Sequence, residues 1–132
     1  MSRIAWLGWL GLLLLTGCGR DAEQLTTVRG KVFYQGRPLI GGTIIFTPDP
    51  ERGGSGPMSY AEIQADGSYT LRTRQGMGAM PGWHRVTVTE AAPTVAIPGQ
   101  GHLPPKFSDP EQSGERREVK PGQENEIDFH LE

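Results

Sequence analysis

Cys18 is the residue best suited to covalent chemistry, because its thiol is the only soft nucleophile among the 132 residues of the chain. It closely follows an apolar run, residues 4–15, that only glycine interrupts. A helix over these twelve residues would measure about 18 Å, which is too short for a hydrocarbon core of about 30 Å. The basic start followed by a short apolar run predicts an export signal.

The residues that end this run resemble a bacterial lipobox, in which the cysteine becomes the lipidated first residue of the mature protein: Leu15, Thr16, Gly17 and Cys18. The resemblance implies a lipoprotein signal peptide over residues 1–17 and acyl chains such as palmitate on Cys18. Residues 18–25 would be a lipidated tether. Several acyl chains exceed the two signals that stable anchoring requires. The alternative is an ordinary secretory signal with an incidental cysteine.

These features predict a protein of the cell envelope that is anchored to a membrane without spanning it. Gly19, not an aspartate that could act as an inner-membrane retention signal, follows the cysteine. This weakly favours the outer membrane in a cell with two membranes. The net charge of -2 offers nothing for counterion release, so we expect no nucleic-acid partner.

The other groups that could bind a metal are scattered. His84 shares strand parity with Val86 and Val88, so its side chain is expected to face the core, whereas His130 faces solvent and His102 lies in a long loop. None has a second ligand at zinc spacing. The loop carboxylates lack the alternating spacing of a calcium site and are expected to be solvated: Asp49, Glu51, Asp66, Asp109 and Glu111. We expect no metal and no cofactor.

No arrangement typical of a catalytic site stands out. The chain has no nucleophile elbow and no close carboxylate pair. Its ending differs from that of hydroxyisourate hydrolases, and its three tyrosines lack the paired histidines of intradiol dioxygenases. A covalent bond between Lys31 and Asn125, as in some adhesin domains, would need a buried lysine, but Lys31 has the parity of the outer face. We therefore predict that the chain is not an enzyme.

After the tether, apolar residues alternate with polar ones in seven short segments, which predict strands of two sheets packed over one core. Asp66 and Gly67 stand between two of them as a hairpin signal. The segments are 28–32, 44–46, 61–65, 69–72, 85–89, 118–120 and 127–131. We expect an all-β, antiparallel sandwich of about seven strands, over residues 26–132.

Two connections are longer than a minimal sandwich needs. Residues 49–57 are rich in Gly, Pro and Ser, as flexible loops are. Residues 91–114 form a connection whose length is uncommon and often functional. It is expected either to present a binding surface or to lie along the sandwich with Phe107 at the edge of the core.

Three stretches together resemble carboxypeptidase regulatory-like domains, which have a transthyretin-like (prealbumin-like) fold. Residues 28–46 contain Gly30, Val32 and the Gly36-Arg37-Pro38-Leu39 turn, residues 65–71 contain the Asp-Gly-Ser-Tyr-Thr-Leu hairpin, and residues 81–88 contain Pro-Gly-Trp-His-Arg-Val-Thr-Val. The whole chain is similar to small bacterial lipoproteins that carry one such domain.

The resemblance implies a module without catalysis of its own that acts in structure or interaction. Fold analogy alone does not establish a function. We expect a lipid-anchored envelope module whose partner is an envelope protein. The alternative is a surface lipoprotein that binds a glycan or a small ligand, for which Trp83 is the one tryptophan beyond the signal.

Overall fold

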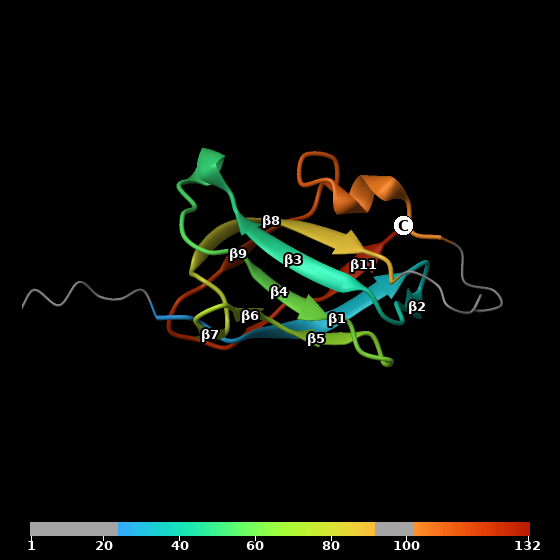
Figure 1. Ribbon diagram of the computed structural model, residues 1–132, viewed down its shortest axis with the longest axis horizontal. Helices are drawn as coiled ribbons and strands as arrows, with labels where there is room; N and C mark the ends of the chain where they lie inside the picture. Colours follow the sequence, from blue (N-terminus) through green and yellow to red (C-terminus); the bar gives the residue numbers. More distant parts are fainter. Residues whose placement is uncertain (1–23, 92–101) are drawn as a thin grey trace, which may run out of the picture.

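The computed structural model describes residues 24–91 and 102–132, which form two β-sheets packed face to face (Figure 1). The five-stranded sheet is built around β1 and consists of β1 (Val28–Tyr34), β2 (Arg37–Pro38), β5 (Ser68–Thr70), β10 (Asn125–Glu126) and β11 (Phe129–Leu131). The six-stranded sheet runs in the order β7 (Gly76–Met77), β6 (Arg72–Thr73), β4 (Ser59–Glu62), β3 (Thr43–Pro48), β8 (Gly82–Thr89) and β9 (Arg116–Val119). The predicted all-β sandwich is confirmed.

Two short 3-10 helices, η1 (Pro50–Arg52) and η2 (Pro105–Ser108), lie outside the sheets. In the residues described, no helix has the length and apolar character needed to cross a membrane. Each of the seven predicted segments overlaps an observed strand. The strands that the sequence did not predict have two residues each, too few for alternation to appear: β2, β6, β7 and β10.

The core lies between the sheets and is filled by the inward-facing residues of each strand. In β1 the buried positions alternate with accessible ones, as a strand with one buried face requires. Aromatic rings from both sheets meet at the centre, where Phe46 lies 5.8 Å from Phe129 and 6.3 Å from Tyr69 between ring centroids. These contacts join β3 of one sheet to β5 and β11 of the other.

Strand β1 pairs with β10 and with β11, the last two strands of the chain, and both pairings are parallel. The other ladders are antiparallel. Between β10 and β11 the chain leaves the ladder at Ile127, whose carbonyl oxygen would lie 1.9 Å from a Cβ at position 30. Glycine at position 30 is therefore a packing requirement of β1.

The turn at Asp66 and Gly67 is tight, as the sequence predicts, with the Gln64 N–H donating to the Ser68 carbonyl at 2.8 Å, but it does not continue as a hairpin within one sheet. Gly67 has a φ of 84°, as such a turn needs, but the strands on its two sides belong to different sheets. The Gly67 carbonyl accepts a hydrogen bond from the Val32 N–H at 2.9 Å, and β5 then pairs with β1. The turn thus carries the chain from the six-stranded to the five-stranded sheet.

Candidate functional site

Asp49 holds the start of the 49–57 loop in place at the end of β3. Its side-chain oxygen Oδ1 accepts a hydrogen bond from the Glu51 N–H at 3.1 Å, which caps η1. Its own N–H donates to the Trp83 carbonyl at 2.9 Å, and its carbonyl accepts from Gly54 at 2.8 Å. Asp49 is completely buried, so the prediction that it is a solvated loop carboxylate is wrong. An aspartate directly before a proline is a helix-cap signal that could have indicated this role.

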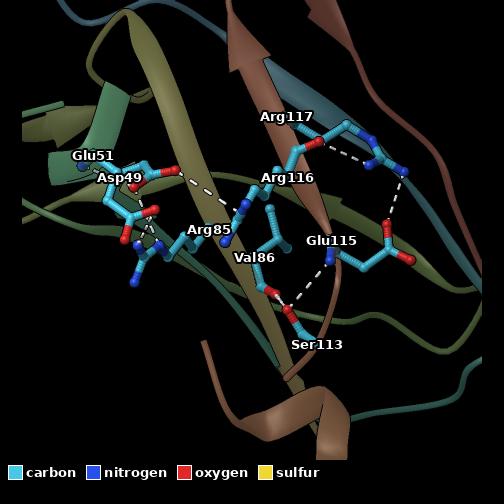
Figure 2. Close-up of polar contacts among 8 residues, drawn as sticks. All are labelled: Asp49, Glu51, Arg85, Val86, Ser113, Glu115, Arg116 and Arg117. Carbon is cyan, nitrogen blue, oxygen red and sulfur yellow. Dashed lines mark hydrogen bonds and ion pairs between the residues drawn. The ribbon is translucent and has the colours of Figure 1, made fainter. Parts of the chain in front are cut away.

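Two arginines from neighbouring strands face the Asp49 carboxylate (Figure 2). The Arg85 Nε lies 3.2 Å from Asp49 Oδ1, and the Arg116 Nε lies 3.9 Å from Asp49 Oδ2. Arg85 also reaches Glu51, with its Nη2 3.3 Å from Oε2. Arg85 and Arg116 are register partners on β8 and β9, so the loop is tied to both strands. The side chain of Arg85 is only 13% exposed, which makes this ion pair more than a surface contact.

The same face of the six-stranded sheet carries two arginines held over aromatic rings. The Arg52 guanidinium carbon lies 4.2 Å from the ring centroid of Trp83, and that of Arg72 lies 5.7 Å from the ring centroid of Tyr60. Trp83 and Tyr60 both alternate with inward-facing buried residues of their strands, so they lie on the outer face. We call the four residues the arginine–aromatic face. Because Arg52 covers the Trp83 ring, that side of the ring is closed to a sugar.

A hollow of about 560 Å³ lies beside this face, where β4 and β5 separate into different sheets. Its walls are polar and apolar in about equal measure: the Tyr60 ring lies at one side, and the polar part consists of hydroxyl, amide and charged groups. The side chains that supply these groups are Glu62, Gln64, Ser68, Thr70 and Arg72. This composition suits a small ligand that carries both polar groups and an apolar face.

The described part of the long connection, residues 102–114, lies along the sandwich. Leu103 and Phe107 are buried in the core, as expected for Phe107. The Ser113 hydroxyl donates to the Val86 carbonyl at 2.7 Å and accepts from the Glu115 N–H, which joins the connection to β8 (Figure 2). The proposed binding surface over residues 91–114 is therefore packed structure from residue 102 onward, and residues 92–101 lie outside the described part.

Arg117 of β9 contacts both a carboxylate and an aromatic ring. Its Nη2 lies 2.9 Å from Glu115 Oε2, and its guanidinium carbon lies 4.7 Å from the Phe129 ring centroid (Figure 2). Arg117 thereby links β9 to β11. The contact is structural and leaves the outer face free.

The three histidines lie apart, where the sequence places them. His84 is buried against Phe46, and its Nε2 donates to the Met80 carbonyl at 2.7 Å. Burial lowers its pKa, against the opposing effect of the carbonyls of Met80 and Phe46. His130 is exposed and stacks on Phe33, whereas the His102 Nδ1 lies 3.5 Å from the Glu90 Oε2. Within residues 24–91 and 102–132, no three His, Cys, Asp or Glu side chains gather to hold a metal ion.

The groups considered for covalent or tyrosine chemistry are also separate. Lys31 is exposed, and Asn125 uses its side-chain amide within its own turn, donating to Lys120 and accepting from it. Tyr34 donates to the His102 carbonyl at 3.3 Å, and Tyr69 donates to the Ile127 carbonyl. Cys18, the predicted lipidation site, lies outside the described residues, as do residues 1–17 and most of the tether.

Comparison with known proteins leaves the family open. No family model and no curated protein matches the chain. One solved structure that it matches is described as the dioxygenase domain of a dioxygenase and carbohydrate-binding protein fusion from the cellulolytic bacterium Streptomyces sp. SirexAA-E. The two are 24% identical, the match covers 85% of this chain and 83% of that one, and the TM-score is 0.40.

This match corrects the prediction that the chain is not an enzyme, because the solved protein it resembles is named for a catalytic activity. We therefore withdraw that prediction. A TM-score of 0.40 carries no argument for a particular activity, and we derive no catalytic step from it.

Proposed function

We propose that the chain is a lipid-anchored module of the cell envelope whose sandwich presents an interaction surface to an envelope protein. The anchor is Cys18, in the lipobox-like sequence that follows the apolar run. The sandwich then acts as a carboxypeptidase regulatory-like domain would, as a rigid support for a surface. Gly19 after the cysteine favours the outer membrane as its place.

The observation that carries this proposal is the arginine–aromatic face. Arg52 and Arg72 are exposed, yet each guanidinium rests on a ring of the same sheet face. Arg, Trp and Tyr are the residues that most often dominate the binding energy of protein interfaces. A side chain already held in place loses less entropy when a partner binds.

The chemistry of the face indicates the kind of partner. A planar guanidinium above a ring can still donate hydrogen bonds from its edge, and a carboxylate accepts them in pairs. The partner surface would therefore carry Asp or Glu together with apolar groups that pack beside the rings. Asp49 stabilises the arginine–aromatic face indirectly, because its hydrogen bonds fix the loop that carries Arg52.

Cross-linking and affinity capture from native membranes tests the proposal. The tagged full-length protein should capture a defined envelope protein, identified by mass spectrometry. Cys18→Ser should lose that partner through loss of the anchor, and Arg52→Ala with Arg72→Ala should lose it while the protein stays in the membrane. Arg37→Ala is the matched control, since Arg37 is an exposed arginine of the other sheet. Equal capture of the envelope protein by the unaltered protein and by all three variants would refute the assignment of the arginine–aromatic face.

A second candidate, binding of a glycan or small polar ligand, is favoured by the hollow between β4 and β5. Its hydroxyl and amide groups could bond sugar hydroxyls, and the Tyr60 ring could stack on a sugar face. Screening the protein against an array of bacterial and plant oligosaccharides tests this function. Binding that Tyr60→Ala abolishes and Arg52→Ala preserves would place a glycan in the hollow, whereas an array without any binding would exclude the glycans tested.

A further inference from the structure

We propose that the end of the sandwich from which the tether leaves docks on a bilayer surface with anionic headgroups; the inference rests on the lipid anchor proposed at Cys18. We call this region the tether end. It consists of residues 24–27, the β6–β7 hairpin at residues 72–77, Pro81 and the turn at residues 120–124.

Residues 24–27, the first described residues, are fixed to the tether end by several contacts. Thr26 and Ala79 exchange backbone hydrogen bonds of 2.8 and 2.9 Å. A Cβ at Gly76 would lie 3.7 Å from the Leu25 side chain, so β7 passes directly beside residues 24–27. In Figure 1 the start of β1, β7 and the beginning of β8 gather at one end of the sandwich, on the left of the view.

The short stretch of chain between Cys18 and Gln24 limits the distance between the tether end and the membrane. Gln24 follows Cys18 by six positions, and a fully extended chain spans at most about 21 Å over six residue steps. The seven-residue strand β1 leads away from the tether end for about 23 Å. An acyl anchor at Cys18 therefore keeps the tether end within reach of the headgroups, while the opposite end of β1 stays farther off.

The side chains of the tether end match a bilayer surface. Met77 is 63% exposed, the largest exposed fraction among the large hydrophobic residues of the described chain. Arg74 and Lys120 are exposed cations of this end, and Glu124 is paired with Arg29 at 3.1 Å. Arg72 also belongs to this end but lies over the Tyr60 ring. The end thus offers one exposed apolar side chain and two further cations, the combination that binds anionic lipid surfaces.

A hollow of about 630 Å³ completes the tether end. Its walls include Leu25, Pro81 and Pro121, which are apolar, together with Gly122 and Gln123. Residues 24–27, the first described residues after Cys18, line the hollow, so a headgroup could enter it beside them.

The chain's one cysteine allows a direct test. Acylation uses the Cys18 thiol, so Met77→Cys adds one free thiol to the lipidated protein. Ile40→Cys is the matched control, because Ile40 is 46% exposed and follows β2, at the far end of β1. Both proteins are purified with their lipid, labelled with an environment-sensitive fluorophore and reconstituted on the outside of phosphatidylglycerol–phosphatidylcholine vesicles.

We expect several-fold weaker quenching of the label at position 77 by a water-soluble quencher than of the label at position 40. Arg74→Glu with Lys120→Glu should abolish this protection on anionic vesicles. Equal quenching at both positions, on protein that floats with the vesicles, would overturn the docking and leave the anchor intact. An unmodified mass at Cys18, with no flotation, would instead overturn the proposed anchor itself.

Discussion

The hydroxyl of Tyr69 donates a hydrogen bond to the backbone carbonyl of Ile127, across the bare backbone of Gly30. Tyr69 and Gly30 are register partners on β5 and β1, and the Ile127 carbonyl lies where a side chain at position 30 would be. The glycine makes room for the carbonyl, and the tyrosine satisfies it. Burial, with a smaller contribution from Asp128, raises the pKa of Tyr69, so the hydroxyl remains a donor.

Tyr69→Phe should therefore lower the free energy of unfolding by about 1–3 kcal/mol, because a buried carbonyl loses its partner. Urea unfolding of the chain from residue 18 onward, with Cys18→Ser, measures the change. Tyr60→Phe is the control, since this hydroxyl lies on the outer face, and it should cost less than about 0.5 kcal/mol. Equal losses in the two variants would contradict the role of the Tyr69 hydroxyl.

Asp49→Ala should lower the free energy of unfolding by about 3–5 kcal/mol, because it leaves the largely buried Arg85 without its main partner. It also removes the acceptor of the Glu51 N–H. Glu51→Ala is the matched control: the Glu51 side chain is 72% exposed, so its ion pair should contribute less than about 1 kcal/mol. Thermal unfolding followed by circular dichroism distinguishes them, and a mild Asp49→Ala would mean that Arg85 finds solvent instead.

Alternation in the sequence was sufficient to predict the sandwich, because each sheet has one buried face and the strands show it. The Asp49 network was not predictable in the same way. Asp49 stands in a stretch of Gly, Pro and Ser that resembles a solvated loop, and Arg85 and Arg116 are distant in the sequence. Only the register between β8 and β9 brings the two arginines to the same carboxylate.

The crossing at Gly67 was missed for a related reason. A turn signal shows that the chain reverses but not which strand it pairs with next. Here the Val32 N–H binds Gly67 and draws β5 to β1. Parity, in contrast, placed His84 and His130 on the correct sides, because it depends on neighbours in the same strand.

The stability of the fold should fall as the pH is lowered below about 6.5, the ordinary pKa of histidine. Burial lowers the pKa of His84 in the folded protein, so the unfolded chain takes up a proton first. The stabilisation that comes from keeping His84 neutral is complete above pH 6.5. It is lost as the pH falls toward the pKa of His84 in the folded protein, and the free energy of unfolding then changes by up to about 1.4 kcal/mol per pH unit.

Urea unfolding at closely spaced pH values between 7.5 and 5 measures this slope. His84→Gln keeps a donor for the Met80 carbonyl and should flatten the profile in this range. His130→Gln, at an exposed position, should leave the slope as it is. A slope that survives His84→Gln would show that another group titrates.

Arg52→Ala should shift the fluorescence emission of Trp83 to longer wavelength and increase its quenching by acrylamide, because the guanidinium now covering the ring at 4.2 Å is removed. In the chain from residue 18 onward Trp83 is the sole tryptophan, so the signal has one source. The free energy of unfolding should change by about 1 kcal/mol or less, as for an exposed cation–π pair. Arg37→Ala should leave the emission unchanged. An unaltered spectrum in Arg52→Ala would mean that the ring is already free in solution, which would remove the held arginine on which the proposed partner surface depends and favour sugar stacking on Trp83 instead.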